Sequence, residues 1–242
     1  MSFSRNGGPV GRVVGLWRYP VKSMAGEALA EVEVSWHGFA GDRRWAFIRD
    51  GVVQSGFPWL TLRERGDMSH YRPSLLEPAR PDQSPTAVST PSGATFDVAD
   101  PALAAELGPG VRVIKQDRGV FDTMPLSLIT TQTIDRLGAM TEAALDVRRF
   151  RPNVLVEAAD DTPFAEDAWV GCVLRIGGIR MRVDKRDGRC AVITIDPATT
   201  ERSPAILRAI ARDRAGCLGV YGSTVEPGRI AVGDPVIVDS AV

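Results

Sequence analysis

The sequence is poor in the residue types that most often bind metals. It has three cysteines and two histidines among 242 residues, and no two cysteines form a Cys-x-x-Cys pair. A zinc site built from several Cys and His ligands is therefore not expected. The odd number of cysteines indicates a reducing compartment rather than a disulfide-stabilised secreted protein.

Long apolar segments are also missing. The first residues lack the hydrophobic core of a signal peptide. No uninterrupted apolar run is long enough to span a bilayer. Together with the cysteine usage, these absences predict a soluble cytoplasmic protein with no membrane partner.

The chain has no excess of charge of either sign. Lys and Arg number 29, Asp and Glu number 30, and the formal net charge is −1. This balance gives no signal for nucleic acid, so no nucleic-acid partner is expected. The sequence also has no Gly-rich dinucleotide fingerprint, no phosphate-binding P-loop and no Gly-x-Ser-x-Gly elbow. Serine hydrolase chemistry is therefore poorly supported.

Strand patterns dominate what is present. Residues 12–19 are rich in β-branched and aromatic side chains, and residues 28–34 alternate apolar with charged ones. Gly177-Gly178, between two apolar runs, predicts a β-hairpin. Helix signals are fewer: Pro101 after Asp and Pro204 after Ser each predict the start of a short helix. We therefore expect a mainly β or α+β fold with a few short helices.

Cys190 differs from the other cysteines because it follows the basic stretch Arg182–Arg189. Nearby cations favour the thiolate, which is both the nucleophilic and the metal-binding form of cysteine. We hypothesise that Cys190 binds a soft metal centre whose anionic ligand is held by the neighbouring arginines. The alternative, a small buried cysteine behind a solvated basic turn, is open on these residues alone. Cys172 and Cys217 lie in apolar runs and are interpreted as core residues.

Cationic side chains recur at the ends of predicted strands. Such groups bind phosphate and other multidentate anions, although each segment alone is more typical of a solvated face. Together with Cys190 they favour an anionic cofactor. The segments are Lys22-Ser23, Arg43-Arg44, Arg148–Asn153 and Arg180–Arg189. Thr130, at the start of a predicted helix, adds amides that suit an anion, while helix capping alone also explains a threonine there.

A set of short motifs follows in a fixed order along nearly the whole chain. They are Tyr19-Pro-Val-Lys-Ser23, Asp42-Arg43-x-Trp45, Asp122-x-x-Pro125, Phe150-Arg-Pro-Asn153, Ala165-Glu-Asp-x-Trp169, Arg189-Cys190, Asp196-Pro197-x-Thr199 and Val232-Gly-Asp-Pro235. As an ordered set they resemble the MOSC proteins, named for the C-terminal domain of molybdenum-cofactor sulfurase. The resemblance is strongest to the two-part architecture of the mitochondrial amidoxime reducing component and its bacterial relatives.

The resemblance implies a fold, a cofactor and a set of ligands. A MOSC β-barrel domain would cover residues 118–242 and a smaller β-rich domain residues 8–117, with molybdenum cofactor between them. Cys190 would ligate molybdenum, because thiolate softness suits a metal already bound by dithiolene sulfurs. The residues implied to hold the pterin and its phosphate are Lys22, Ser23, Arg43, Arg151, Asn153 and Arg189, and Thr130 is predicted to join them as the helix N-terminus.

Two positions depart from the family pattern. Gly188 stands where the closest relatives have serine, so one hydrogen bond to the cofactor is expected to be missing. Thr200 stands where the family usually has glycine, which leaves the path of that loop open. The membrane anchor of the mitochondrial relatives is absent from the sequence, so their location is not carried over.

The resemblance implies a molybdenum-dependent oxidoreductase that reduces N-hydroxylated small molecules, with Cys190 at the catalytic metal. Electrons would come from a separate partner protein, because the sequence has no flavin, haem or iron–sulfur signature. Two alternatives are a carrier that binds molybdenum cofactor without turnover and a sulfur carrier acting through a Cys190 persulfide. Neither Lys22 nor Lys185 is assigned to a pyridoxal phosphate Schiff base, because both are better explained as anion contacts.

Overall fold

The computed structural model describes residues 8–51 and 57–241, and its largest sheet closes into a barrel. The sheet has eight strands in the order β11-β10-β14-β13-β12-β16-β1-β2, and β1 also pairs with β11. The seven strands from β11 to β1 are therefore closed, and β2 lies outside the ring beside β1. The strands are β1 (Gly11–Arg18), β2 (Glu27–Leu29), β10 (Leu126–Thr130), β11 (Val154–Ala158), β12 (Cys172–Ile176), β13 (Ile179–Gly188), β14 (Cys217–Glu226) and β16 (Pro235–Ala241).

The interior of the barrel is filled by the apolar side chains that the strand alternation predicts. Along β13, Ile179, Met181 and Val183 are buried and the residues between them are more exposed. β12 and β13 form the hairpin predicted at Gly177-Gly178. Gly177 has φ +53°, and a Cβ at this position would meet Asp234 Oδ2 at 2.1 Å, so the turn requires glycine.

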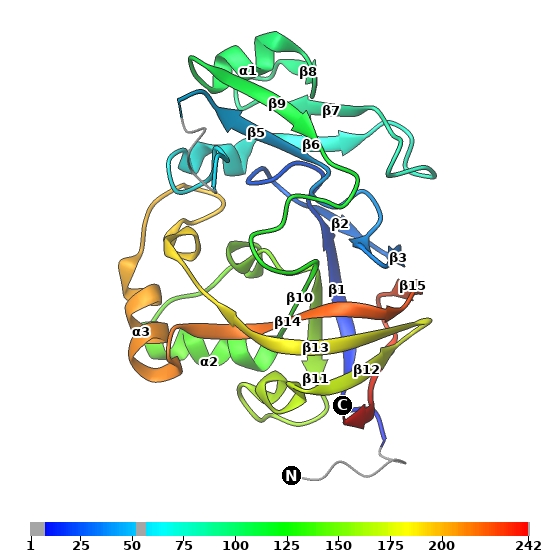
Figure 1. The fold of residues 1–242 in the computed structure, drawn as a ribbon. Helices are drawn as coiled ribbons and strands as arrows, with labels where there is room; N and C mark the ends of the chain where they lie inside the picture. The colour runs from blue at the N-terminus through cyan, green and yellow to red at the C-terminus, as the bar shows by residue number, and fades with distance from the viewer. Residues whose placement is uncertain (1–7, 52–56, 242) are drawn as a thin grey trace.

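A second group of strands lies above the barrel in Figure 1. β5 pairs with β9, and β6, β7 and β8 form a three-stranded sheet. These strands pack with α1 around a separate apolar core that includes Phe47 and Leu103, both fully buried. The elements are β5 (Trp45–Arg49), η1 (Gly66–His70), β6 (Arg72–Leu75), β7 (Thr86–Ser89), β8 (Thr95–Asp97), α1 (Pro101–Leu107) and β9 (Val111–Lys115).

A small sheet in the order β15-β3-β4 joins an early and a late part of the chain. α2 and α3 cover a third apolar cluster at the side of the barrel and contain its residues Leu137 and Ile210. The elements are β3 (Glu31–Ser35), β4 (Gly38–Phe39), β15 (Gly228–Ala231), α2 (Thr131–Thr141), η2 (Val147–Phe150), η3 (Ala165–Trp169), η4 (Ala191–Thr194) and α3 (Pro204–Arg214).

The mainly β fold with a barrel and a few short helices is confirmed. The helices predicted from Pro101 and Pro204 both form, and Asp100 caps α1 by accepting from the Ala102 amide, whereas the side chain of Ser203 makes no capping hydrogen bond. The division at residues 117 and 118 stays a prediction. β1 lies before that division and nevertheless pairs with β11 and β16 as part of the barrel.

Candidate functional site

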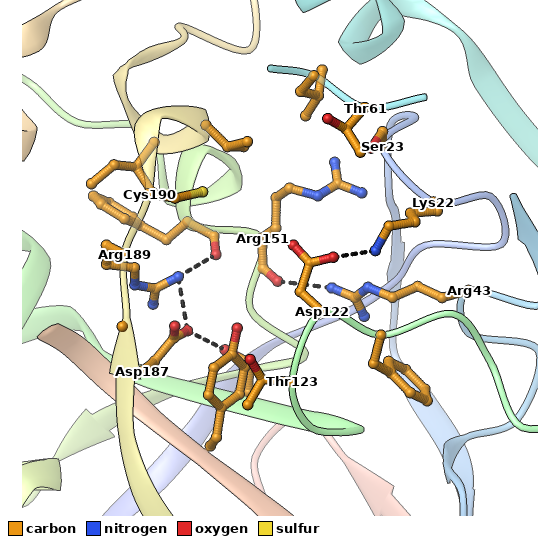
Figure 2. Close-up of a pocket in the computed structure, with 18 of the residues that line it drawn as sticks. Lys22, Ser23, Arg43, Thr61, Asp122, Thr123, Arg151, Asp187, Arg189 and Cys190 are labelled. Carbon is orange, nitrogen blue, oxygen red and sulfur yellow. Dashed lines mark hydrogen bonds and ion pairs between the residues drawn. The ribbon is translucent and has the colours of Figure 1, made fainter. Parts of the chain in front are cut away.

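A cavity of about 310 Å³ lies between the barrel and the N-terminal strands (Figure 2). Its walls come from distant parts of the chain, which include the segment after β1, the turn before β5, residues 57–63, residues 121–127, the loop from η2 to β11, and the junction of β13 with η4. This is the arrangement that the cationic motifs predicted. The predicted site residues that line the cavity are Lys22, Ser23, Arg43, Arg151, Asn153, Arg189 and Cys190.

Cys190 is half-buried where β13 gives way to η4. It is the residue before the first turn of η4, and its extended backbone directs the chain from the strand into that turn. Arg63 Nη2 donates to Cys190 Sγ at 3.3 Å. A thiolate accepts such a charge-assisted hydrogen bond better than a thiol does, so this contact suits the metal-binding form of the residue.

Two cations of the cavity lie against the ring of Tyr19. The guanidinium carbon of Arg43 is 4.6 Å from the ring centroid and that of Arg151 is 4.3 Å from it. Tyr19 is buried, and burial raises its pKa to about 12 against the opposing effect of the two arginines. The neutral phenol donates to Pro152 O at 3.1 Å, so the aromatic ring supports two like charges at short range.

Arg151 is a half-buried cation without an ion-pair partner among the described residues. Its Nη1 donates to Met24 O at 2.8 Å, while its Nη2 is buried and makes no hydrogen bond to any part of the chain that the structure describes. Burial lowers the pKa of Arg151 to about 10. An uncompensated buried charge costs free energy, and an anion in the cavity would relieve that cost.

Arg189 and Asp187 form the opposite wall, as Figure 2 shows. Arg189 donates to Phe150 O at 2.9 Å and to Leu218 O at 2.7 Å, and it pairs with Asp187 at 2.9 Å. Its Nη2 has no partner among the described residues. Burial raises the pKa of Asp187, although Arg189 partly opposes that change.

Lys22 is held at the side of the cavity facing Cys190 by an ion pair with Asp122 and by a hydrogen bond to Val120 O at 3.1 Å. Burial lowers the pKa of Lys22, and Asp122 only partly offsets it. The Asp122 side chain is 41% exposed, whereas that of Lys22 is 7% exposed. The pair therefore connects the cavity with solvent.

Asn153 lines the cavity, but its amide is already engaged by the protein. Its Nδ2 donates to Trp17 O at 3.2 Å and to Asp42 Oδ2 at 3.1 Å, and its Oδ1 accepts from the Ser127 amide at 3.3 Å. Asp42 in turn pairs with Arg43. Asn153 thus fixes the carboxylate that orients Arg43.

The structure gives Thr130 a different role from the predicted cofactor contact. Its side chain is fully buried, is not among the residues that line the cavity, and caps α2 by accepting from the Thr133 amide at 3.3 Å. The Thr130 hydroxyl also donates to the buried Glu166 at 2.8 Å. Capping, the other explanation for a threonine at this position, accounts for it.

Arg63, Asp187 and Tyr19 are among the residues at the site that were not predicted. Arg63 lies in the mixed segment 57–77, for which the sequence predicts one or two short strands, and nothing in the local sequence indicates its contact with Cys190. Asp187 belongs to the basic stretch Arg182–Arg189, which precedes Cys190. A carboxylate among arginines is usually interpreted as their salt-bridge partner, so the sequence offers no reason to place Asp187 at the site. Tyr19 opens one of the family motifs without an assigned role. Cys217 also differs from its interpretation as core: it is half-buried, with Sγ 3.7 Å from Ala215 O.

The fold and the cavity define a class of protein: a closed β-barrel whose cation-lined cavity contains one cysteine. Residues 115–237 match the family model described as the MOSC domain, and residues 10–105 match the MOSC N-terminal beta barrel domain. The chain belongs to the MOSC family.

Relatives of known name cover most of the chain. Human mitochondrial amidoxime-reducing component 1 is 23% identical to this chain over an aligned length of 292 residues. The match covers 94% of this chain and 82% of that protein. The molybdenum cofactor sulfurase of Drosophila grimshawi is 28% identical over 269 residues, covering 91% of this chain and 34% of the sulfurase. The chain thus spans about a third of the length of this sulfurase.

Among solved structures, the YuaD protein of Bacillus subtilis superposes with a TM-score of 0.52 at 12% identity, covering 93% of both chains. This likeness supports the fold alone. Within the described residues, no helix combines the length and the apolar character needed to cross a membrane.

Proposed function

We propose that the chain binds molybdenum cofactor in this cavity and uses it to reduce N-hydroxylated small molecules. The proposal rests mainly on one observation: the cavity contains a half-buried thiol, Cys190, together with the guanidinium groups of Arg151 and Arg189. Each of these guanidinium groups has a buried nitrogen that makes no hydrogen bond among the described residues. Such a cavity suits a ligand that is anionic at one end and carries a soft metal at the other.

The residues present fit molybdenum cofactor chemically. Cys190 would ligate the metal, since a thiolate suits a metal that already has sulfur ligands. Arg43, Arg151 and Lys22 would neutralise the phosphate, and the free Nη2 groups of Arg151 and Arg189 would donate to the pterin or to its phosphate. Ser23, which is buried and lines the cavity, adds a hydroxyl to that set.

Removal of an oxygen atom from an N-hydroxy group consumes two electrons and two protons and releases one water molecule. The bound cofactor would supply the oxygen-atom transfer, and a separate protein would supply the electrons. Lys22 Nζ holds a proton inside the cavity, and its lowered pKa, caused by burial, makes that proton easier to transfer. The partly exposed Asp122 provides the route by which Lys22 regains a proton from solvent.

The names of the relatives support this assignment. Two human proteins called mitochondrial amidoxime-reducing components match over 94% of this chain, and one of them is 25% identical. Matches to molybdenum cofactor sulfurases are consistent with the same cofactor in the same kind of domain. We favour reduction over sulfur transfer because the cavity provides buried cations for a whole cofactor in addition to the thiol.

The test compares the wild-type chain with Cys190→Ser after expression in a host that makes the cofactor. We expect the wild type to carry molybdenum and pterin and to reduce an amidoxime when reduced methyl viologen supplies the electrons. We expect the molybdenum content of Cys190→Ser to be lower by a factor of at least about ten. Cys217→Ser removes a half-buried thiol outside the cavity and should keep its metal.

Equal molybdenum in the wild type and Cys190→Ser, or none in either, would contradict cofactor binding through Cys190. A wild-type protein loaded with cofactor but inactive toward amidoximes would indicate a carrier. A persulfide on Cys190 without molybdenum, detected by intact-mass measurement, would indicate a sulfur carrier.

A further inference from the structure

Arg63 is a cavity residue that contacts Cys190 Sγ but to which the cofactor assignment gives no part in substrate binding. It belongs to the segment between β5 and η1, in the N-terminal part of the chain, and it reaches across to the barrel side. Its Nη2 lies 3.3 Å from Cys190 Sγ and 3.5 Å from Asp122 Oδ2. Figure 2 shows Thr61, two residues earlier, on the side of the cavity that faces Cys190.

The position of Arg63 is at the mouth of the cavity rather than in its depth. The Arg63 side chain is 35% exposed, compared with 7% for Lys22 and 14% for Arg43. Its backbone is anchored, because Arg202 Nη2 donates to Arg63 O at 3.2 Å. A molecule that enters from solvent toward Cys190 therefore meets this guanidinium.

The contact between Arg63 and Asp122 can be exchanged at little cost. Asp122 is already paired with Lys22, and its contact with Arg63 is longer than a strong charge-assisted hydrogen bond. An incoming carboxylate can thus take the Arg63 guanidinium while Asp122 keeps Lys22. A planar guanidinium binds a carboxylate through two parallel hydrogen bonds, which a lysine cannot reproduce.

Flat molecules are favoured by what lies beside Arg63. The guanidinium carbon is 5.0 Å from the centroid of the Phe57 ring, and Leu62 and Val192 also line the cavity. Aromatic and apolar walls next to a fixed cation suit a conjugated ring that bears an anionic group. A cationic substrate would meet like charge at the entrance.

We infer that Arg63 is a specificity-determining residue that selects flat N-hydroxy compounds carrying a negative charge. This inference rests on the proposed function and names its substrate class. Arg63 would bind the anionic substituent of the substrate while the N-hydroxy group faces Cys190.

The experiment uses the protein as isolated with its cofactor, and rates are expressed per bound molybdenum. Benzamidoxime, its 4-carboxy derivative and its 4-trimethylammonio derivative differ in charge at the ring position opposite the amidoxime. We expect the wild type to prefer the carboxylate over the neutral compound by roughly tenfold in kcat/KM, mainly through KM. Arg63→Gln should bring that ratio close to one, and Arg63→Glu should shift the preference toward the cationic compound.

Arg212→Gln is the matched control, because Arg212 is a 72% exposed arginine on α3 outside the cavity. It removes the same charge from the chain and should keep the wild-type ratio. A second measurement does not need turnover: line broadening of 4-fluorobenzoate in ¹⁹F NMR spectra should be strong with the wild type and weak with Arg63→Gln.

The outcomes separate this inference from the proposed function. If the wild type reduces the neutral compound without preferring the anionic one, or if Arg63→Gln slows all three compounds equally, Arg63 does not select substrate and the reductase assignment stands. If no compound is reduced but 4-fluorobenzoate binds through Arg63, the reductase assignment fails and the anion site stands. Absence of both effects overturns both.

Discussion

At the scale of single residues, the site is distinguished by arginine side chains with buried nitrogens that have no hydrogen-bond partner among the described residues. Arg151 lies beside Tyr19 and Arg43 and keeps one nitrogen without a partner among the described residues. Natural proteins rarely bury a charge in this way unless a ligand completes the arrangement. The free energy spent on folding around Arg151 is recovered when an anion binds.

We expect Arg151→Gln to stabilise the ligand-free chain while removing anion binding. Folding lowers the pKa of Arg151 to about 10, mainly through burial. Below pH 10 both states carry the charge and the native state bears its full cost, which is lost only as pH rises above about 10. At pH 7 the variant should therefore gain ~1–3 kcal/mol in free energy of unfolding.

Urea denaturation at fixed ionic strength, with and without inorganic phosphate, measures both effects. Phosphate should raise the wild-type free energy of unfolding by about 1 kcal/mol at a few times its Kd and leave Arg151→Gln unchanged. Arg148→Gln, in the same segment but 56% exposed, should stay within about 0.5 kcal/mol of the wild type. The prediction would be contradicted if Arg151→Gln were less stable than the wild type without phosphate and were stabilised by phosphate as much as the wild type is.

The two departures from the family pattern are both accommodated locally. Thr200 has φ +63°, the left-handed conformation that a glycine adopts freely, and its amide donates to Asp196 O at 2.9 Å. The loop therefore follows a path suited to glycine in spite of the β-branched residue, at a cost of roughly 1–2 kcal/mol. A Cβ at Gly188 would meet nothing within 4 Å, so a serine would also fit there.

At the scale of secondary-structure elements, local signals predicted most starts and turns. Asp100, Thr130 and the Gly177-Gly178 turn each do what their residue type indicates, because capping and turn geometry depend on a few neighbouring residues. Asp187 and Arg63 could not be assigned in the same way. Their roles depend on which distant segments lie together at the cavity, and the periodicity of the sequence does not show which segments these are.

A buried acid of η3, Glu166, lies against the N-terminus of α2 and accepts from the hydroxyls of Thr130 and Thr133, each at 2.8 Å. Burial raises the pKa of Glu166, and these hydrogen bonds only partly oppose the rise. Below the unfolded value of 4.5 the acid is protonated in both states. As pH rises through the folded pKa, the unfolded state has already released its proton, so the native state loses stability.

We therefore expect the wild type to lose more stability between pH 4 and pH 8 than Glu166→Gln does. Free energies of unfolding from urea titrations at a series of pH values measure this difference. Thr133→Val removes one of the hydrogen bonds that favour the carboxylate and should steepen the loss. Parallel pH profiles for the wild type and Glu166→Gln would show that burial does not control this carboxyl group.

At the scale of the whole molecule, the segment after Cys190 is shared between two apolar cores. Val192 and Ile195 pack with the N-terminal strands, whereas Ile193, between them, packs with the helices beside the barrel. In Figure 1 this part of the chain runs between the upper strands and the barrel. The position of Cys190 therefore depends on both halves of the molecule. The family motifs predicted a cofactor between the halves, but no single motif shows which apolar core each residue after Cys190 joins.

This sharing predicts that the two regions unfold together and that Ile195 couples them. Ile195→Ala should cost about 2–4 kcal/mol, since Ile195 is 4% exposed, and the N-terminal strands should then lose protection from hydrogen exchange at lower urea than the barrel. Peptides from β5 and β9, compared with peptides from β12 and β13, report the two regions separately. Ile206 is 1% exposed and belongs only to the cluster beside the barrel, so Ile206→Ala should shift both regions together.

Because the cavity lies between the regions, Ile195→Ala should also release bound molybdenum faster than Ile206→Ala does. Coincident loss of protection in both variants would mean that contacts other than Ile195 join the two halves.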